Sequence, residues 1–145
     1  MKKLALTDFA KYRYPSAMEL SPDSRYLTFA LKDVDREGDG YRWNLWLYDL
    51  GRRESRQITQ GDDQRKAVWE DNTHILYKTT EPDEALRARG FEEEWTVYHR
   101  LNVCTGEDRE AFRLPMSVSG LWKMDEGRYV FTGETHLDRP NLLEL

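Results

Sequence analysis

Few side chains in this chain have the types and spacing that acyl-transfer chemistry needs. A serine nucleophile of the Gly-x-Ser-x-Gly kind sits on a strand-to-helix turn, and no such string occurs among the 145 residues. Ser117 and Ser119 precede Gly120, but without that spacing. The three histidines fall in two expected strands and a late loop, at His74, His99 and His136. We therefore expect no Ser–His–Asp triad and no catalytic residue within this chain.

Two groups of residues have the ligand types of a metal site but not its spacing. Residues 33–39 match positions 1, 3, 5 and 6 of a calcium loop, but Asn44 stands where a bidentate glutamate is required. The single cysteine, Cys104, forms no tight ligand pair with His99 or His136, as a closed zinc site demands. We interpret the acidic run as a solvated loop and the other three residues as parts of strands, turns and loops. We expect no metal and no other cofactor.

The composition excludes several classes of partner. A net charge of −5 leaves no basic face for nucleic acid. No run approaches the ~20 apolar residues of a membrane span. The N-terminus begins with two lysines, like a signal peptide, but Asp8 and Lys11 interrupt its apolar region. Together with a lone cysteine, which allows no internal disulfide, these features favour a cytoplasmic protein.

A hairpin pattern occurs three times, at residues 20–29, 69–77 and 122–131. Each copy has a bulky apolar residue, a polar turn with an aspartate, and a short β-type run. The runs end on aromatic residues that lie 48 and 54 residues apart, Phe29, Tyr77 and Phe131. A period near 50 residues with two hairpins per repeat is typical of a β-propeller blade. We expect Phe29, Tyr77 and Phe131 to occupy equivalent strand positions, and Trp69 and Trp122 to superpose.

The pattern predicts an all-β fold, a partial propeller of about two and a half four-stranded antiparallel blades. The expected strands are 25–31, 43–50, 56–59, 68–69, 74–79, 96–103 and 109–114. A short helix is expected within 4–14, a polar loop over 32–42 and one or two helical turns within 81–90. We expect a single domain, 1–145, with repeats at 1–66, 67–115 and 116–145. A propeller closes with ~4–8 blades, so we expect the chain to belong to a larger ring.

Three strings carry a family resemblance: residues 20–29, residues 44–49 (Asn-Leu-Trp-Leu-Tyr-Asp) and residues 56–59 (Arg-Gln-Ile-Thr). They resemble the start of the N-terminal propeller of prolyl-oligopeptidase-type serine peptidases, the S9 family, and are most similar to its acylaminoacyl-peptidase-like members. Ser24 replaces the usual turn glycine of the family, and residues 70–72 lack its Ser-Pro step. The propeller of the Tol–Pal system carries the same Ser-Pro-Asp hairpin.

The resemblance implies a two-domain enzyme that hydrolyses short peptides. Its propeller would cap an α/β-hydrolase domain, absent from this chain, and would filter substrates by size on their way to the serine there. The parent protein would be a hydrolase, while this chain alone would have no triad. The alternative is a non-enzymatic binding propeller of the Tol–Pal type, which docks a protein partner.

Three consecutive glutamates follow the expected inserted helix, Glu92, Glu93 and Glu94. Two carboxylates can neutralise and orient an ammonium group, and dipeptidyl-peptidase relatives in the wider family bind the amino terminus of a peptide with such a pair. The resemblance therefore implies a substrate-binding role for this triplet. The alternative is a charged loop paired with nearby arginines.

The repeat pattern also predicts how the isolated chain behaves. Each unit of a repeat protein buries its apolar face against its neighbours, so an open array leaves terminal faces and strand edges uncovered. We expect the fragment to self-associate through such surfaces.

Overall fold

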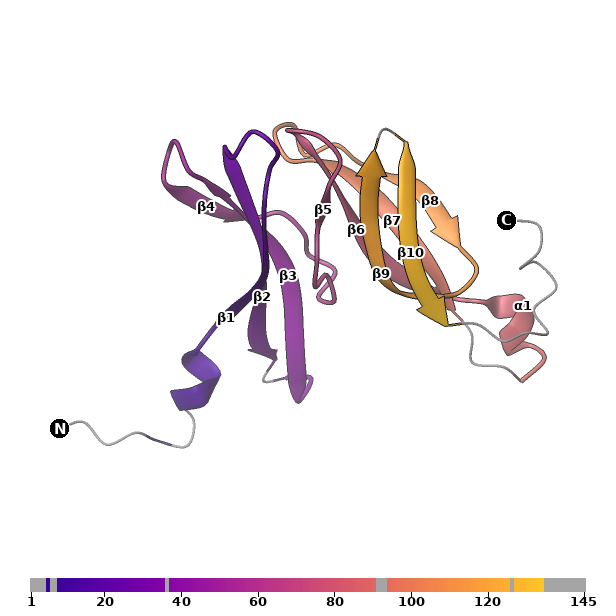
Figure 1. The fold of residues 1–145 in the computed structure, drawn as a ribbon. Helices are drawn as coiled ribbons and strands as arrows, with labels where there is room; N and C mark the ends of the chain where they lie inside the picture. The colour runs from indigo at the N-terminus through magenta and orange to yellow at the C-terminus, as the bar shows by residue number, and fades with distance from the viewer. Residues whose placement is uncertain (1–4, 6–7, 36, 91–93, 126, 135–145) are drawn as a thin grey trace. The chain divides into compact units, whose positions relative to one another are not determined.

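The computed structural model describes residues 5, 8–35, 37–90, 94–125 and 127–134. Figure 1 shows a chain built mostly from antiparallel strands, with two short helical segments. It divides into two compact units, Met1–Ala67 and Val68–Leu145. Among the residues that are described, no helix is long and apolar enough to cross a membrane.

The first unit contains one four-stranded sheet, here called the first sheet. Its strands follow chain order, β1 (Tyr14–Leu20), β2 (Tyr26–Asp35), β3 (Gly40–Asp49) and β4 (Glu54–Gln57). All three pairings are antiparallel. One face of the sheet carries apolar and β-branched side chains that are almost fully buried, namely Tyr26, Thr28, Ala30, Leu45 and Leu47.

The N-terminal helix is much shorter than the sequence predicts. Within the described part of 4–14, only Asp8–Lys11 is helical, as a single 3-10 turn, η1. Pro15 disfavours a helical conformation at Tyr14, and Tyr14 pairs instead with Lys32 at the start of β1. The sheet therefore begins at the residue where the expected helix was to end.

The prediction of a polar loop over 32–42 is wrong, because most of these residues belong to strands. β2 and β3 pair without interruption from Tyr26↔Asp49 to Asp35↔Gly40. Lys32 lies opposite Trp43, and its Nζ sits 3.7 Å from the centre of the Tyr41 ring and 5.3 Å from that of Trp43. Cross-strand contacts between a lysine and two aromatic rings stabilise this hairpin. Its polar composition, taken alone, is typical of a solvent-exposed loop.

The turn that joins β1 to β2 forms where the sequence predicts it. The Ser24 amide donates to the Ser21 carbonyl at 2.8 Å, and the Ser21 hydroxyl donates to Asp23 Oδ1 at 2.7 Å. The backbone of Ser24 is left-handed, with φ of 59°. Glycine adopts this conformation without a steric penalty, which explains why glycine suits this position of the motif.

The second unit holds another four-stranded sheet, the second sheet. Its strands are β5 (Val68–Trp69), β6 (His74–Pro82), β7 (Glu94–Asn102) and β8 (Asp108–Leu114), again antiparallel and in chain order. Between β6 and β7 lies α1 (Glu84–Arg87), one turn of helix. The side chain of Asp83 caps it by accepting from the Leu86 amide at 3.1 Å.

Two further strands, β9 (Ser117–Asp125) and β10 (Arg128–Glu134), form the third hairpin. It packs on the second sheet, across β6–β8 in Figure 1, through a buried cluster of Leu76, Tyr98, Leu114, Met116, Val118 and Leu121. The buried hydroxyl of Thr96 on β7 donates to the Met116 carbonyl at 2.7 Å and accepts from the Val118 amide at 3.0 Å. Packing and paired backbone groups thus join the hairpin to the sheet.

The three repeated hairpins share strand order but not register. Leu20 pairs with Leu27 and Trp69 with Ile75, each two residues before the closing aromatic. Trp122 pairs with Val130, one residue before Phe131. Because side chains alternate between faces, Tyr77 shares a face with Trp69, whereas Phe131 points away from the face of Trp122.

The expected superposition of Trp69 and Trp122 is therefore wrong. Trp69 is buried, whereas the side chain of Trp122 is 47% exposed. The pairing of β10 with β9 shifts between Arg128 and Tyr129. An irregularity of this kind moves a strand by one residue, and a one-residue shift exchanges the two faces.

Candidate functional site

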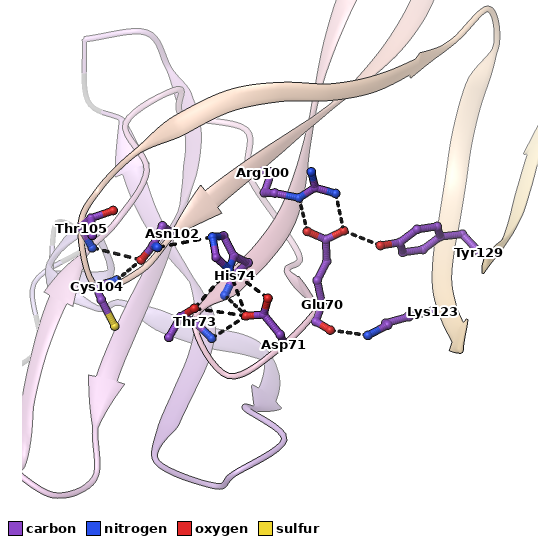
Figure 2. Close-up of polar contacts among 10 residues, drawn as sticks. All are labelled: Glu70, Asp71, Thr73, His74, Arg100, Asn102, Cys104, Thr105, Lys123 and Tyr129. Atoms are coloured by element: carbon purple, nitrogen blue, oxygen red, sulfur yellow. Dashed lines mark hydrogen bonds and ion pairs between the residues drawn. The ribbon is translucent and has the colours of Figure 1, made fainter. Parts of the chain in front are cut away.

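Two polar clusters lie in the second unit, and the larger centres on Glu70 in the turn between β5 and β6. Figure 2 shows Arg100 and Tyr129 converging on its carboxylate, while the ammonium of Lys123 reaches its backbone carbonyl. Arg100 binds both carboxylate oxygens, Nε to Oε2 and, at 2.8 Å, Nη2 to Oε1. Bidentate charged pairs of this kind are directional and strong. This cluster, the Glu70 hub, joins β7, β9 and β10 to one turn.

Burial and hydrogen bonding act in opposite directions on the Glu70 carboxyl. Its side chain is only 10% exposed, and burial alone would raise its pKa. The hydrogen bonds from Arg100 and Tyr129 outweigh this and hold the pKa of Glu70 below its usual value. Burial, followed by the bond to Glu70, raises the pKa of Tyr129 to about 12. The hub is thus an ionised carboxylate between a cation and a neutral phenol.

The neighbouring His74 has an aspartate partner but no nucleophile in the position of a triad. Its Nδ1 lies 3.0 Å from Asp71 Oδ2 and 3.1 Å from the Thr73 hydroxyl. Its Nε2 faces the amide nitrogen of Asn102 at 3.3 Å (Figure 2). The Thr73 hydroxyl therefore contacts Nδ1 of His74, the same ring nitrogen that contacts the Asp71 carboxylate. Asn102 in turn accepts from the Cys104 amide at 2.9 Å, so this network orders two turns.

The second cluster lies across β6, β7 and β8 and contains His99. The ring of His99 stacks on Tyr77 with centroids 5.1 Å apart, and Nε2 lies 3.0 Å from the Thr79 hydroxyl. The Tyr77 hydroxyl donates to Asp108 Oδ2 at 2.5 Å. Burial and this bond together raise the pKa of Tyr77. Sequence reasoning missed Thr79 and Asp108 because only strand register makes them diagonal neighbours of His99.

A hydroxyl, an imidazole and a carboxylate are thus aligned, but they do not form a catalytic set. His99 Nδ1 and Asp108 Oδ1 are 3.7 Å apart, which is too long for a hydrogen bond that would orient the base. The other oxygen of Asp108 accepts from Tyr77. The threonine is a β-branched strand residue, not part of a strand-to-helix turn. The cluster connects three strands and offers no activated nucleophile.

The remaining residues that the sequence singled out, whether predicted or rejected as site residues, are scattered. Ser119 binds Thr132, contacting its carbonyl at 3.1 Å and its hydroxyl at 2.9 Å, across the third hairpin. Cys104 lies in the exposed turn between β7 and β8. Glu94 begins β7 and is exposed. Glu92, Glu93 and His136 lie outside the described residues.

The acidic run at 33–39 is divided between the end of β2 and the turn before β3. Asp33 and Asp35 belong to β2, and Asp33 lies 3.0 Å from the Arg13 guanidinium. Among the described residues, no group of three or more histidine, cysteine, aspartate or glutamate side chains is arranged to hold a metal ion.

Comparison with known proteins gives a likeness in structure only. No protein-family model and no curated protein sequence matches the chain. The β-propeller domain of the Trilobed protease from Pyrococcus furiosus superposes with a TM-score of 0.58 over 85% of this chain, at 13% sequence identity. The chain has the fold of part of a β-propeller. The predicted resemblance of this chain to a protease propeller is thus confirmed at the level of the fold.

The match also shows what share of the known structures this chain corresponds to. It covers 34% of the P. furiosus chain. A Pyrococcus horikoshii acylaminoacyl peptidase matches at 15% identity and a TM-score of 0.44, over 79% of this chain and 27% of its own. The chain therefore spans about a third or less of the length of either protein.

Proposed function

We propose that this chain is part of the propeller of a serine peptidase of the prolyl-oligopeptidase class. The observation that carries the proposal is the shared fold with the propeller domain of a protease over 85% of the chain. The strings at 20–29, 44–49 and 56–59 support it independently, because fold similarity at 13% identity does not depend on them. Within this class, the three strings are most similar to the acylaminoacyl-peptidase-like enzymes.

In this proposal the propeller controls access and the chemistry takes place elsewhere. The serine nucleophile belongs to an α/β-hydrolase domain that the propeller caps, and short peptides are its substrates. A size filter must keep its aperture fixed, and bonds between the elements of the second unit would help to do so. The Glu70 hub and the buried Thr96 hydroxyl join the third hairpin to the second sheet by charged and neutral bonds.

Further parts of the proposal rest on the sequence. The triplet Glu92–Glu94, which follows the inserted helix α1 in the chain, would bind the amino terminus of the peptide. The three repeats, 1–66, 67–115 and 116–145, would form successive parts of one ring. A lone cysteine and an acidic chain suit a cytoplasmic enzyme.

The decisive experiment uses the full protein encoded by the open reading frame that contains this chain. A fluorophosphonate probe should label one serine in a Gly-x-Ser-x-Gly string, and a variant with alanine at that serine should lose both labelling and peptide hydrolysis. An open reading frame without the string, or a protein that resists the probe and retains a protein partner, would favour the Tol–Pal type of binding propeller.

The filtering role has its own test in the same protein. Peptides of increasing length should show a sharp fall in kcat/KM beyond a limiting size. Glu70→Gln should make the fall in kcat/KM with peptide length more gradual, because it weakens the link between the second sheet and the third hairpin. Glu54→Gln, at an exposed position of β4, is the matched control and should leave the limit unchanged. A limit that is the same in all three proteins would contradict the filtering role.

A further inference from the structure

The segment between β4 and β5 stays bound to the first sheet after β4 has ended. β4 stops at Gln57, although β3 extends beyond it. The Ile58 amide then donates to the Leu45 carbonyl at 2.8 Å, and the Leu45 amide donates to the Thr59 hydroxyl, also at 2.8 Å. Residues 58–65, here called the connector, therefore continue along the edge of β3.

The connector makes a second contact with β3 at Trp43. The Trp43 amide donates to the Asp62 carbonyl, and the Gln64 amide donates to the Trp43 carbonyl, each at 2.9 Å. Trp43 and Asp63 form a parallel bridge. The guanidinium of Arg65 lies over the Trp43 ring, 3.9 Å from its centre, and pairs with Asp63 at 2.7 Å. The far end of the connector is thus held as firmly as its start.

Asn44 lies between these two contacts and binds the connector with its side chain. Its Nδ2 donates to Asp62 Oδ1 at 2.8 Å, and its Oδ1 accepts from the Asp62 amide at 3.1 Å. The Thr59 hydroxyl lies 3.5 Å from the same Oδ1. A side-chain amide offers both a donor and an acceptor. It therefore replaces the backbone pairing that further residues of β4 would have supplied.

The second sheet uses a polar side chain at a corresponding place. Thr96 lies in the first half of β7, as Asn44 lies in the first half of β3. The Thr96 hydroxyl binds the Met116 carbonyl and the Val118 amide, soon after β8 has ended. Each sheet thus fastens the chain that leaves its fourth strand to its third strand through one side chain. Recurrence in both sheets indicates a role of this position in the repeat.

We propose that Asn44 is a positioning residue, which fixes the connector to the first sheet and confines bending between the two units to the residues after Arg65. Only Lys66 and Ala67 lie between Arg65 and the start of β5. A connector that is bonded along its length moves with its sheet, whereas a free loop allows the elements that it joins to move independently.

An exchange of two side chains isolates this contact. Asn44→Asp keeps an acceptor for the Asp62 amide but places a carboxylate against that of Asp62, so the connector should open more often. Asn44→Ala removes both bonds without adding a charge and should act in the same direction. In the double exchange, Asn44→Asp with Asp62→Asn, donor and acceptor change places and the contact should return. The left-handed backbone at Asp62, with φ of 64°, suits asparagine as well as aspartate.

Native-state proteolysis measures how often the connector opens. Trypsin needs an extended stretch of chain around the bond that it cuts, so cleavage after Arg65 requires the connector to leave β3. Asn44→Asp should raise the rate of this cleavage roughly tenfold, and the double exchange should restore the wild-type rate. Cleavage after Arg52, in the exposed turn between β3 and β4, should keep its rate in every variant. Ser21→Ala alters only the turn between β1 and β2 and is the matched control, with cleavage after Arg65 unchanged.

Spin labels test the confinement of bending, with one label on Glu54→Cys in the first unit and one on the native Cys104 in the second. Pulsed electron paramagnetic resonance should give a wider distribution of distances in Asn44→Asp than in the wild-type sequence, and the double exchange should restore the width. Thermal melts confirm that each variant is folded.

Three results would overturn the proposal. They are a rate of cleavage after Arg65 that ignores Asn44→Asp, an equal rise in Ser21→Ala, and a distance distribution that is the same in all variants. None of these measurements uses peptide hydrolysis, so their outcome is separate from that of the proposed function.

Discussion

The Tyr129 hydroxyl donates a hydrogen bond to Oε1 of Glu70, a carboxylate that lies 59 residues earlier in the chain. Glu70 also accepts both bonds of the Arg100 guanidinium. One carboxylate therefore joins the third hairpin to β7 of the second sheet. Removing it would leave a guanidinium and a phenol without their acceptor, and these groups are only partly accessible to water.

The first prediction concerns the charge of this carboxylate. Glu70→Gln should lower the free energy of unfolding at neutral pH by roughly 2–3 kcal/mol, because a half-buried arginine loses its counter-charge. Chemical denaturation followed by tryptophan fluorescence measures the change. Glu54→Gln, at an exposed position, should cost less than about 0.5 kcal/mol.

The effect of Glu70 should also depend on pH. Since folding lowers its pKa, the ionised carboxylate stabilises the fold above its unfolded pKa of about 4.3. This contribution is lost as the pH falls through the lower pKa of the folded state. The difference between the wild-type chain and Glu70→Gln should therefore be constant near neutrality and shrink in acid. A difference that stays constant through the acid range would contradict this assignment.

A second prediction concerns the buried hydroxyl of Thr96, which is 0% exposed. Thr96→Val preserves the shape but leaves the Met116 carbonyl and the Val118 amide without a partner. It should cost roughly 2–6 kcal/mol, about 1–3 for each of the two buried groups. Thr96→Ser retains the hydroxyl, loses one methyl group and should cost about 1 kcal/mol. The opposite ranking in equilibrium unfolding would show that the methyl group matters more than the bonds.

A third prediction concerns the turn between β1 and β2. Ser24→Gly should stabilise the chain by about 0.5–1 kcal/mol, because the left-handed backbone there strains any residue with a Cβ. Ser21→Ala should do the reverse and cost about 1 kcal/mol. It removes the hydroxyl that donates to Asp23 and accepts from the Tyr26 amide at 2.9 Å. Thermal denaturation of both variants beside the wild type checks the two signs.

A fourth prediction concerns the His99 cluster. The isolated chain should release no p-nitroaniline from acyl-peptide substrates, because the 3.7 Å separation leaves His99 without a carboxylate that orients it. His99→Ala should give the same absence of turnover. Hydrolysis that survives a check for contaminating protease and disappears in His99→Ala would assign a catalytic role to this cluster.

Local patterns in the sequence were sufficient for much of the fold. The Ser21–Ser24 turn, the capped helix that begins at Glu84 and the pairing of Trp69 with Ile75 all depend on residues close together in the chain. The repeat spacing likewise placed Phe29, Tyr77 and Phe131 on the second strand of each hairpin. Turn chemistry and alternation act over a few residues, so the sequence displays them directly.

Predictions made from composition were wrong where pairing with another strand determines the backbone conformation. Residues 32–35 and 40–42 look like a solvated loop, but they pair across β2 and β3 because Lys32 meets the rings of Tyr41 and Trp43. Of the helix expected within 4–14, the described residues form only the turn Asp8–Lys11, and Tyr14 at the end of that range pairs with Lys32. Tertiary pairing overrides local propensity in residues 32–35 and 40–42.

The sequence by itself therefore determined the class of fold, the order of the strands and the absence of a nucleophile motif. Only the tertiary structure decided which face each aromatic side chain occupies, since a single shift between Arg128 and Tyr129 separates Phe131 from the pattern of Tyr77. It also brought Glu70 to Tyr129 and Thr79 to His99. Those contacts depend on register and on packing between sheets, and neither is encoded by the spacing of residues along the chain.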